Sequence, residues 1–243
     1  MANFLLVHGG FHGGWCWDAV VPLLEKAGHT ALAPDLPAMG SNTAISPAEV
    51  TLALWGDAIA QIAIAAPEPV ILVGHSRGGI VISEAAERAP EAVAGLVYCS
   101  AMLLEDGDSL MVASSRLMPH FSPRVIVSED GASINIDTGV VQEIFYNRTG
   151  QDVARRAIAR LTPEPIRPNT TPIHITAERF GSIPRSFIEC SDDNAIPLTV
   201  QRAMQAALLC NPVMLLESDH SPFFSAPEAL TEALVRIANI WGR

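Results

Sequence analysis

Basic residues are scarce in this sequence. Fifteen lysines and arginines stand against 26 aspartates and glutamates, so the formal net charge is −11 at pH 7 and the pI is near 5.0. Nucleic acids and anionic membranes both require a positive binding surface, and neither is therefore an expected partner. The sequence leaves room for one local basic patch, around Arg155, Arg156 and Arg160.

Cysteines are few and widely separated. The four cysteines are Cys16, Cys99, Cys190 and Cys210. They form no C-x-x-C pair and stand at no cysteine–histidine spacing that is typical of zinc sites. We therefore expect free, buried thiols and no metal site.

Long apolar runs are also missing. No stretch reaches the roughly eighteen consecutive apolar residues of a membrane-spanning helix. Residues 1–7 lack a basic segment, and their apolar stretch is too short for a secretory signal peptide. We expect a soluble, cytoplasmic protein without a membrane partner, and the sequence leaves a homodimer open.

The composition is sufficient for one large core domain. The chain has 243 residues, of which 49% are hydrophobic. Length alone could suggest two domains, but a single domain of this size is ordinary for α/β folds.

Short apolar runs alternate with helical patterns along most of the chain. We predict strands at 4–7, 30–33, 70–73, 95–99, 187–190 and 213–216. This alternation is typical of βαβ units, in which helices cover both faces of a parallel sheet. The predicted fold class is α/β, with a mostly parallel central sheet.

Capping signals predict where the helices begin and end. A helix over 18–27 is expected to end at Gly28, and another is expected over 79–89. Ser46 and Glu49 resemble a capping box with a proline between them, which predicts a helix start there. Ser225 stands in the same pattern before the last expected helix, 227–241.

The alternation fails between residues 102 and 172. This stretch is interrupted by Pro119, Pro123, Pro163, Pro165, Pro168 and Pro172. Residues 129–131, Glu-Asp-Gly, are typical of a hairpin turn. We interpret 102–172 as a cap inserted into an α/β core that comprises 1–101 and 173–243.

One serine stands between glycines directly after an apolar run. Residues 74–78, Gly-His-Ser-Arg-Gly, fit the G-x-S-x-G pattern, with a strand expected before it and a helix after it. The glycines allow the close strand-to-helix turn that exposes a nucleophilic serine. Ser76 is therefore the predicted nucleophile, although a small residue in a tight turn gives the same pattern.

A serine esterase also needs hydrogen-bond donors for the oxyanion that forms during attack. One donor is the backbone N–H after the nucleophile, here Arg77, and the second comes from a loop after an early strand. Residues 8–14, His-Gly-Gly-Phe-His-Gly-Gly, occupy that place. We predict Gly10 as the second donor, with Phe11 as the alternative.

The nucleophile requires a histidine base and a carboxylate that orients it. His220 alone among the seven histidines follows a late predicted strand and precedes the final helix. Asp193 is the predicted acid, because a strand end followed by D-x-x-I-P, here residues 193–197, favours it, and Asp192 is its rival. An acid one strand earlier would be Asp106 or Asp108, which turn chemistry explains better, and Asp219 is interpreted as capping its loop.

Several further residues are candidates for contact with the substrate. Gly9, Phe11 and His12 lie in the glycine loop, although His12 could equally be bound to backbone. Four aromatic residues could line a pocket or belong to the core: Trp15, Phe121, Phe145 and Tyr146.

These residues resemble the α/β-hydrolases that include plant methylesterases, salicylate-binding esterases, hydroxynitrile lyases and bacterial carboxylesterases. The resemblance rests on segments 4–20, 33–40, 72–79, 178–197, 201–204 and 219–230. It covers almost the whole core and only weakly the cap. It implies an α/β-hydrolase fold and a cofactor-independent enzyme.

Two positions separate the activities within that group. Hydroxynitrile lyases resembling this chain have a lysine after the catalytic histidine and a hydroxylated residue in the oxyanion loop, where this chain has Ser221 and Gly9. The resemblance therefore favours a carboxylesterase for small methyl or aryl esters. A hydroxynitrile lyase, a cofactor-free perhydrolase or haloperoxidase, and a ligand-binding protein remain alternatives. Arg77 departs from the apolar residue usual there, and could contact an acidic substrate or pair with a carboxylate.

Overall fold

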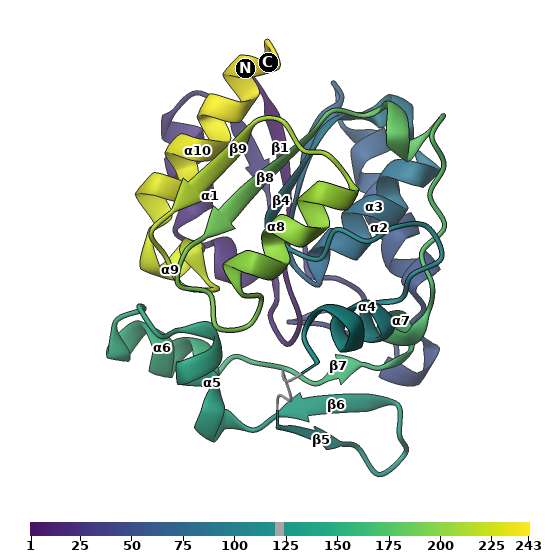
Figure 1. Cartoon of the computed structure of the whole chain (residues 1–243), viewed down its shortest axis with the longest axis vertical. Helices are drawn as coiled ribbons and strands as arrows, with labels where there is room; N and C mark the ends of the chain where they lie inside the picture. Colours follow the sequence, from purple (N-terminus) through teal and green to yellow (C-terminus); the bar gives the residue numbers. More distant parts are fainter. Residues whose placement is uncertain (120–123) are drawn as a thin grey trace.

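A six-stranded sheet forms the centre of the molecule (Figure 1). The computed structural model describes residues 1–119 and 124–243. The sheet has the order β2-β1-β3-β4-β8-β9, and every neighbouring pair is parallel. Its strands are β1 (Asn3–Val7), β2 (Thr30–Leu32), β3 (Val70–Ser76), β4 (Val93–Ala101), β8 (Arg185–Cys190) and β9 (Val213–Leu216). All six predicted strands and the α/β class are confirmed.

Helices cover both faces of this sheet (Figure 1). One face packs against α1 (Val20–Lys26) and α10 (Pro227–Ile240), and the other against α2 (Leu52–Ala65), α3 (Gly78–Arg88) and α8 (Leu198–Ala207). Successive strand residues point to opposite faces. In β3, Ile71 and Val73 pack into the core cluster beside α1 and α10, and Leu72 packs into the cluster beside α2, α3 and α8. The strands are apolar throughout because both faces are buried.

Residues 102–119 and 124–172 lie below the sheet in Figure 1. They form α4 (Leu110–Leu117), β5 (Val125–Val127), β6 (Ser133–Ile136), α5 (Thr138–Phe145), α6 (Gln151–Ile158), β7 (Glu164–Pro165) and α7 (Arg167–Thr170). The strands β5-β6-β7 make an antiparallel sheet. The predicted turn joins β5 to β6, with Gly131 at φ +68°. We call 102–172 the cap segment, and its exact limits stay our interpretation.

The predicted helix start at Ser46 is wrong in position. Ser46 and Glu49 do form a capping box, but on a single 3-10 turn, Pro47–Glu49. Val50 is extended, which interrupts the helix, and α2 begins at Leu52. Its cap is Thr51, whose side chain accepts a hydrogen bond from the N–H of Leu54 at 3.0 Å.

The last helix is predicted correctly but its cap is not. Ser225 closes a short helix, α9 (Pro222–Ser225), and its hydroxyl donates to Asp219 Oδ1 at 2.7 Å. To cap α10, this hydroxyl would have to accept from a backbone N–H at the start of the helix, and no such bond forms. Helix α10 therefore starts at Pro227 without a side-chain cap.

The prediction of free thiols is confirmed, and that of buried thiols holds for all cysteines except Cys210. All four cysteines are free, and three of them are buried. Among residues 1–119 and 124–243, no helix combines the length and the apolar character that crossing a bilayer requires.

The two caps before α2 can be separated by mutation. Thr51→Ala should lower the free energy of unfolding by about 1 kcal/mol, because a fourteen-residue helix loses its cap. Ser46→Ala should cost less, since it affects only an exposed turn of three residues. Urea denaturation of both variants measures the difference, and equal losses would contradict the assignment of Thr51 as the cap.

Candidate active site

Ser76 lies on a tight turn between β3 and α3. Its φ of +52° falls in the left-handed region, which is strained for a residue with a side chain. A Cβ at Gly74 would lie 2.8 Å from the carbonyl oxygen of Gly78. A Cβ at Gly78 would lie 2.7 Å from the carbonyl oxygen of Val7. The turn therefore requires both glycines of the motif.

Three predicted residues from distant segments meet at this turn. Ser76 Oγ lies 3.0 Å from His220 Nε2, and His220 Nδ1 lies 2.8 Å from Asp193 Oδ2. Asp193 is 5% and His220 1% exposed. Because a carboxylate accepts from the Nδ1–H, Nε2 is free to accept the serine proton. The arrangement can activate a hydroxyl as a nucleophile.

Asp193 is surrounded by hydrogen-bond donors. Its Oδ1 accepts from the N–H groups of Ala195 at 2.7 Å and Ile196 at 2.8 Å. Its Oδ2 also accepts from the hydroxyl of Ser100 and, at 3.5 Å, from Gln201 Nε2. These contacts compensate the carboxylate for the water that it loses on burial.

The rival acids are occupied elsewhere. Asp192 binds Arg148 at 2.6 Å and Ser191 at 2.7 Å, with 43% of its side chain exposed. Hydrogen bonds from Ser191 and Arg148 hold the pKa of Asp192 below its usual value. Asp219 accepts from four groups of its surrounding loops, as expected for a capping residue. Asp108 pairs with Arg116 on the surface.

The glycine loop after β1 lies against the nucleophile turn. A Cβ on Gly9 would lie 2.8 Å from Ser76 Cβ. The N–H of Phe11, the alternative oxyanion donor, already donates to Glu164 Oε2 at 2.8 Å. Among the described residues, the N–H groups of Gly10 and Arg77 make no hydrogen bond. They remain the two donors available to an oxyanion.

Two buried histidines beside the site are held in fixed tautomers. His12 Nδ1 donates to the carbonyl of Gly10 at 2.7 Å, and its Nε2 accepts from the hydroxyl of Tyr146 at 2.7 Å. His75 Nε2 donates to the carbonyl of His220 at 2.7 Å. Burial lowers the pKa of His12 to about 4 and that of His75 well below its ordinary value. Both rings are therefore neutral at physiological pH.

A cavity of about 510 Å³ opens over Ser76 and His220. The cap segment supplies most of its apolar wall: Leu110, Met111, Met118, Val125, Ile134, Ile136 and Phe145. Arg77, Glu164 and Asn169 form a polar corner. Glu164 and Asn169 gave no signal in the sequence, since neither stands in a recognisable motif.

Several predicted lining residues lie elsewhere. Phe11, His12 and Phe145 line the cavity, whereas Gly9 packs beneath Ser76. Tyr146 is fully buried and binds His12. Phe121 lies outside the described residues. Trp15 belongs to a different cavity.

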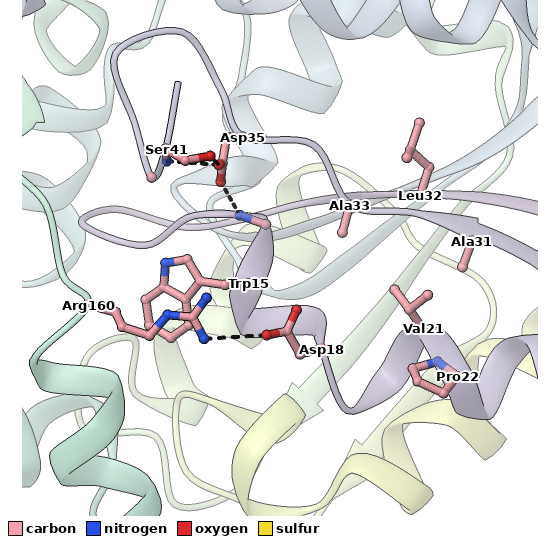
Figure 2. Close-up of a pocket in the computed structure, with 12 residues that line it drawn as sticks. Trp15, Asp18, Val21, Pro22, Ala31, Leu32, Ala33, Asp35, Ser41 and Arg160 are labelled. Carbon is pink, nitrogen blue, oxygen red and sulfur yellow. Dashed lines mark hydrogen bonds and ion pairs between the residues drawn. The ribbon is translucent and has the colours of Figure 1, made fainter. Parts of the chain in front are cut away.

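That second cavity has a volume of about 670 Å³ and lies on the outer side of the glycine loop. Figure 2 shows Arg160 stacked on Trp15, with the guanidinium carbon 4.5 Å from the ring centroid, and bound to Asp18 at 3.4 Å. Asp35 accepts from the N–H groups of Gly14 and Ser41 in the same view. The charge of Arg160 is thus balanced, and so is that of Arg155, which pairs with Asp152.

The doubly covered sheet and the serine turn define a class of protein. A match to the alpha/beta hydrolase family spans residues 4–233. The chain belongs to this family, and its fold is therefore the α/β-hydrolase fold that the resemblance implied.

Individual relatives include esterases from plants and bacteria. Methylesterase 1 of Arabidopsis thaliana is 30% identical over 256 residues, which cover 98% of this chain and 96% of that protein. A pyrethroid hydrolase of Sphingobium wenxiniae is 33% identical over 98% of this chain and 88% of its own. A solved pyrethroid hydrolase from Sphingobium faniae is 31% identical, with a TM-score of 0.85 over 98% of this chain and 97% of that one. This chain spans only 56% and 64% of the length of two chloroplastic relatives from Arabidopsis thaliana.

The buried histidines predict how stability depends on pH. The pKa of His12 is about 4 in the fold and 6.5 in its ordinary state, so between these values the unfolded chain binds a proton that the native state does not. Stability then falls on acidification, by about 1.4 kcal/mol per pH unit for each such histidine. His12→Gln should reduce this slope by about one proton. Urea unfolding between pH 7 and 4.5 measures it, and an unchanged slope would contradict a neutral His12.

Proposed function

We propose that the protein is a carboxylic ester hydrolase that acts through an acyl-enzyme on Ser76. The observation that carries this proposal is the continuous chain of hydrogen bonds from Ser76 through His220 to Asp193, at 3.0 and 2.8 Å. The adjacent N–H groups of Gly10 and Arg77, which make no hydrogen bond within residues 1–119 and 124–243, complete the arrangement. Relatives that are named methylesterase and pyrethroid hydrolase support it.

Each residue has a defined part in the proposed reaction. Ser76 Oγ attacks the ester carbonyl while His220 Nε2 takes its proton, and Asp193 stabilises the imidazolium that forms. The N–H groups of Gly10 and Arg77 bind the oxyanion. His220 then protonates the departing alcohol. Water, deprotonated by His220, attacks the acyl-enzyme and releases the acid.

The cavity favours small, largely apolar esters. Its volume of about 510 Å³ accommodates a compact substrate. The cap segment contributes mainly apolar side chains, together with Ser114, Ser115, Glu164 and Asn169. A charged acyl chain would lose hydration against the apolar part of this wall. We propose methyl or aryl esters, which agrees with the names of the relatives. No metal or organic cofactor has a part in these steps.

One observation argues against the hydroxynitrile lyase activity. Ser221 follows His220, is fully buried and carries no charge, so departing cyanide would meet no cation from this residue. A perhydrolase would use the same triad, and turnover with acetate and peroxide distinguishes it. Two expectations stay predictions from the sequence: a cytoplasmic location, and the absence of nucleic-acid and membrane partners. A homodimer stays open.

Removing the nucleophile tests the mechanism directly. Ser76→Ala should lower kcat for p-nitrophenyl esters by about 10⁶-fold, because no acyl-enzyme can form. Circular dichroism and thermal melting should remain close to those of the unmodified protein. Retained turnover in the folded variant would exclude Ser76 from the reaction.

The two neighbouring aspartates provide a matched comparison. Asp193→Asn should reduce kcat by about 10⁴-fold, since the amide no longer holds His220 in the productive tautomer. Asp192→Asn breaks only a surface pair with Arg148 and should leave kcat almost unchanged. Steady-state kinetics of both variants decide the assignment, and the reverse ranking would move the acid to Asp192.

A further inference from the structure

A buried ion pair adjoins the nucleophile. Arg77 Nε lies 2.8 Å from Glu164 Oε1, and the two side chains are 4% and 2% exposed. Arg77 directly follows Ser76, whereas Glu164 lies on β7 of the cap segment, where it pairs with Ile134 of β6. The guanidinium also lies 4.2 Å from the ring centroid of Trp55. The pair thus joins the nucleophile turn to the cap segment.

Both partners of the pair also bind the glycine loop. Arg77 Nη2 donates to the carbonyl oxygen of Gly9 at 3.0 Å. Glu164 Oε2 accepts from the N–H of Phe11 at 2.8 Å. The loop is therefore held on each side of Gly10, whose N–H is the proposed oxyanion donor.

Because the peptide bond is planar, contacts to the carbonyl of Gly9 also orient the N–H of Gly10. The carbonyl of Gly9 and the N–H of Gly10 belong to one planar trans peptide and point in opposite directions. A donor that fixes the carbonyl of Gly9 therefore also fixes the direction of the N–H of Gly10. His8 donates to the same oxygen through Nδ1 at 2.9 Å, because its Nε2 accepts from the N–H of Leu36. Arg77 is the charged one of these two donors.

We infer that the Arg77–Glu164 pair positions the Gly9–Gly10 peptide so that its N–H faces the substrate oxyanion. This inference rests on the proposed ester hydrolysis. Arg77 then acts twice, since its own backbone N–H is the second donor and its side chain orients the first. A cationic donor on the carbonyl also polarises the peptide, which strengthens its N–H as a donor. Both side chains are positioning residues, because neither bonds to the reacting atoms.

This role differs from binding an acidic substrate. Glu164 already compensates the charge of Arg77, so a carboxylate in the cavity would meet a neutral pair, in which only Nη1 of the guanidinium has no hydrogen-bond partner among the described residues. A positioning pair acts on the transition state and changes kcat, whereas a residue that anchors the substrate changes KM. The two roles can therefore be separated by kinetics.

The test uses the double variant Arg77→Met/Glu164→Met, which keeps the backbone N–H of residue 77 and leaves no single buried charge. With p-nitrophenyl butyrate, kcat should fall by about 10- to 100-fold while KM changes little. The effect should stay below the loss of a whole oxyanion donor, because His8 still holds Gly9. A trifluoromethyl ketone, whose hemiketal oxygen occupies the same position, should bind more weakly by a similar factor.

A control and a second readout complete the experiment. Arg116→Met removes an exposed pair with Asp108, bonded at 3.1 and 2.6 Å, and should leave both constants unchanged. A crystal structure of the double variant should show the Gly9–Gly10 peptide tilted from its original orientation or with higher displacement parameters, since only His8 still holds the carbonyl of Gly9. If the double variant does not fold, Glu164→Gln is measured instead, with the same expected direction.

The outcomes separate this inference from the proposed function. Unchanged kcat and inhibitor affinity in the folded double variant, or a rise in KM alone, would overturn the positioning role while leaving the esterase intact. Absence of esterase activity in the unmodified protein would refute the proposed function. The crystal structure still decides the inference in that case, because an ordered peptide in its original orientation excludes the positioning role.

Discussion

The active site depends on the close approach of β3, α3 and the glycine loop around Ser76. At Gly79, a Cβ would lie 2.3 Å from the carbonyl oxygen of Met102, and at Gly9 it would lie 2.8 Å from Ser76 Cβ. Side chains at these positions would force the segments apart. In the proposed mechanism, this contact between the segments allows the backbone N–H groups of Gly10 and Arg77 to face one oxyanion. The strained φ of Ser76 is tolerated for the same reason, since packing on all sides determines it.

The parallel sheet brings the remaining groups to this turn. Strands β3, β4, β8 and β9 are neighbours in that order. Their carboxyl ends therefore deliver Ser76, Ser100, Asp193 and His220 to one edge. The hydrogen bonds to Asp193 come from its own loop, from Ser100 and from Gln201. These contacts replace the hydrogen bonds to water that the carboxylate loses on burial.

The sequence predicts this part well because local patterns determine it. Buried strands are continuous apolar runs, and the D-x-x-I-P pattern that follows one of them, at 193–197, favoured Asp193 over Asp192. Helix starts are harder, since the capping box at Ser46 forms as predicted but Val50 turns extended and ends the helix. The sequence left Trp15 open between a pocket and the core, and the residue packs against the core while lining the second cavity.

Glu164 illustrates what the sequence could not reveal. It contacts Arg77 across 87 positions of the chain, and the cap segment between them has no regular pattern to predict its path. An arginine after the nucleophile suggested a carboxylate partner, but nothing indicated which one. Only the pairing of β6 with β7 places Glu164 against the glycine loop.

Stability alone does not explain why this pair is buried. Removing two charges from water costs several kcal/mol for each ion, and similar apolar side chains often give an equal or greater stability. Burial does lower the pKa of Arg77, although Glu164 opposes this effect. The hydrogen bonds of the pair are directed to the carbonyl of Gly9 and the N–H of Phe11, the two groups that flank the proposed oxyanion donor. A filled core alone does not require hydrogen bonds in these directions. Catalysis does require them, because the N–H of Gly10 must be held where negative charge develops.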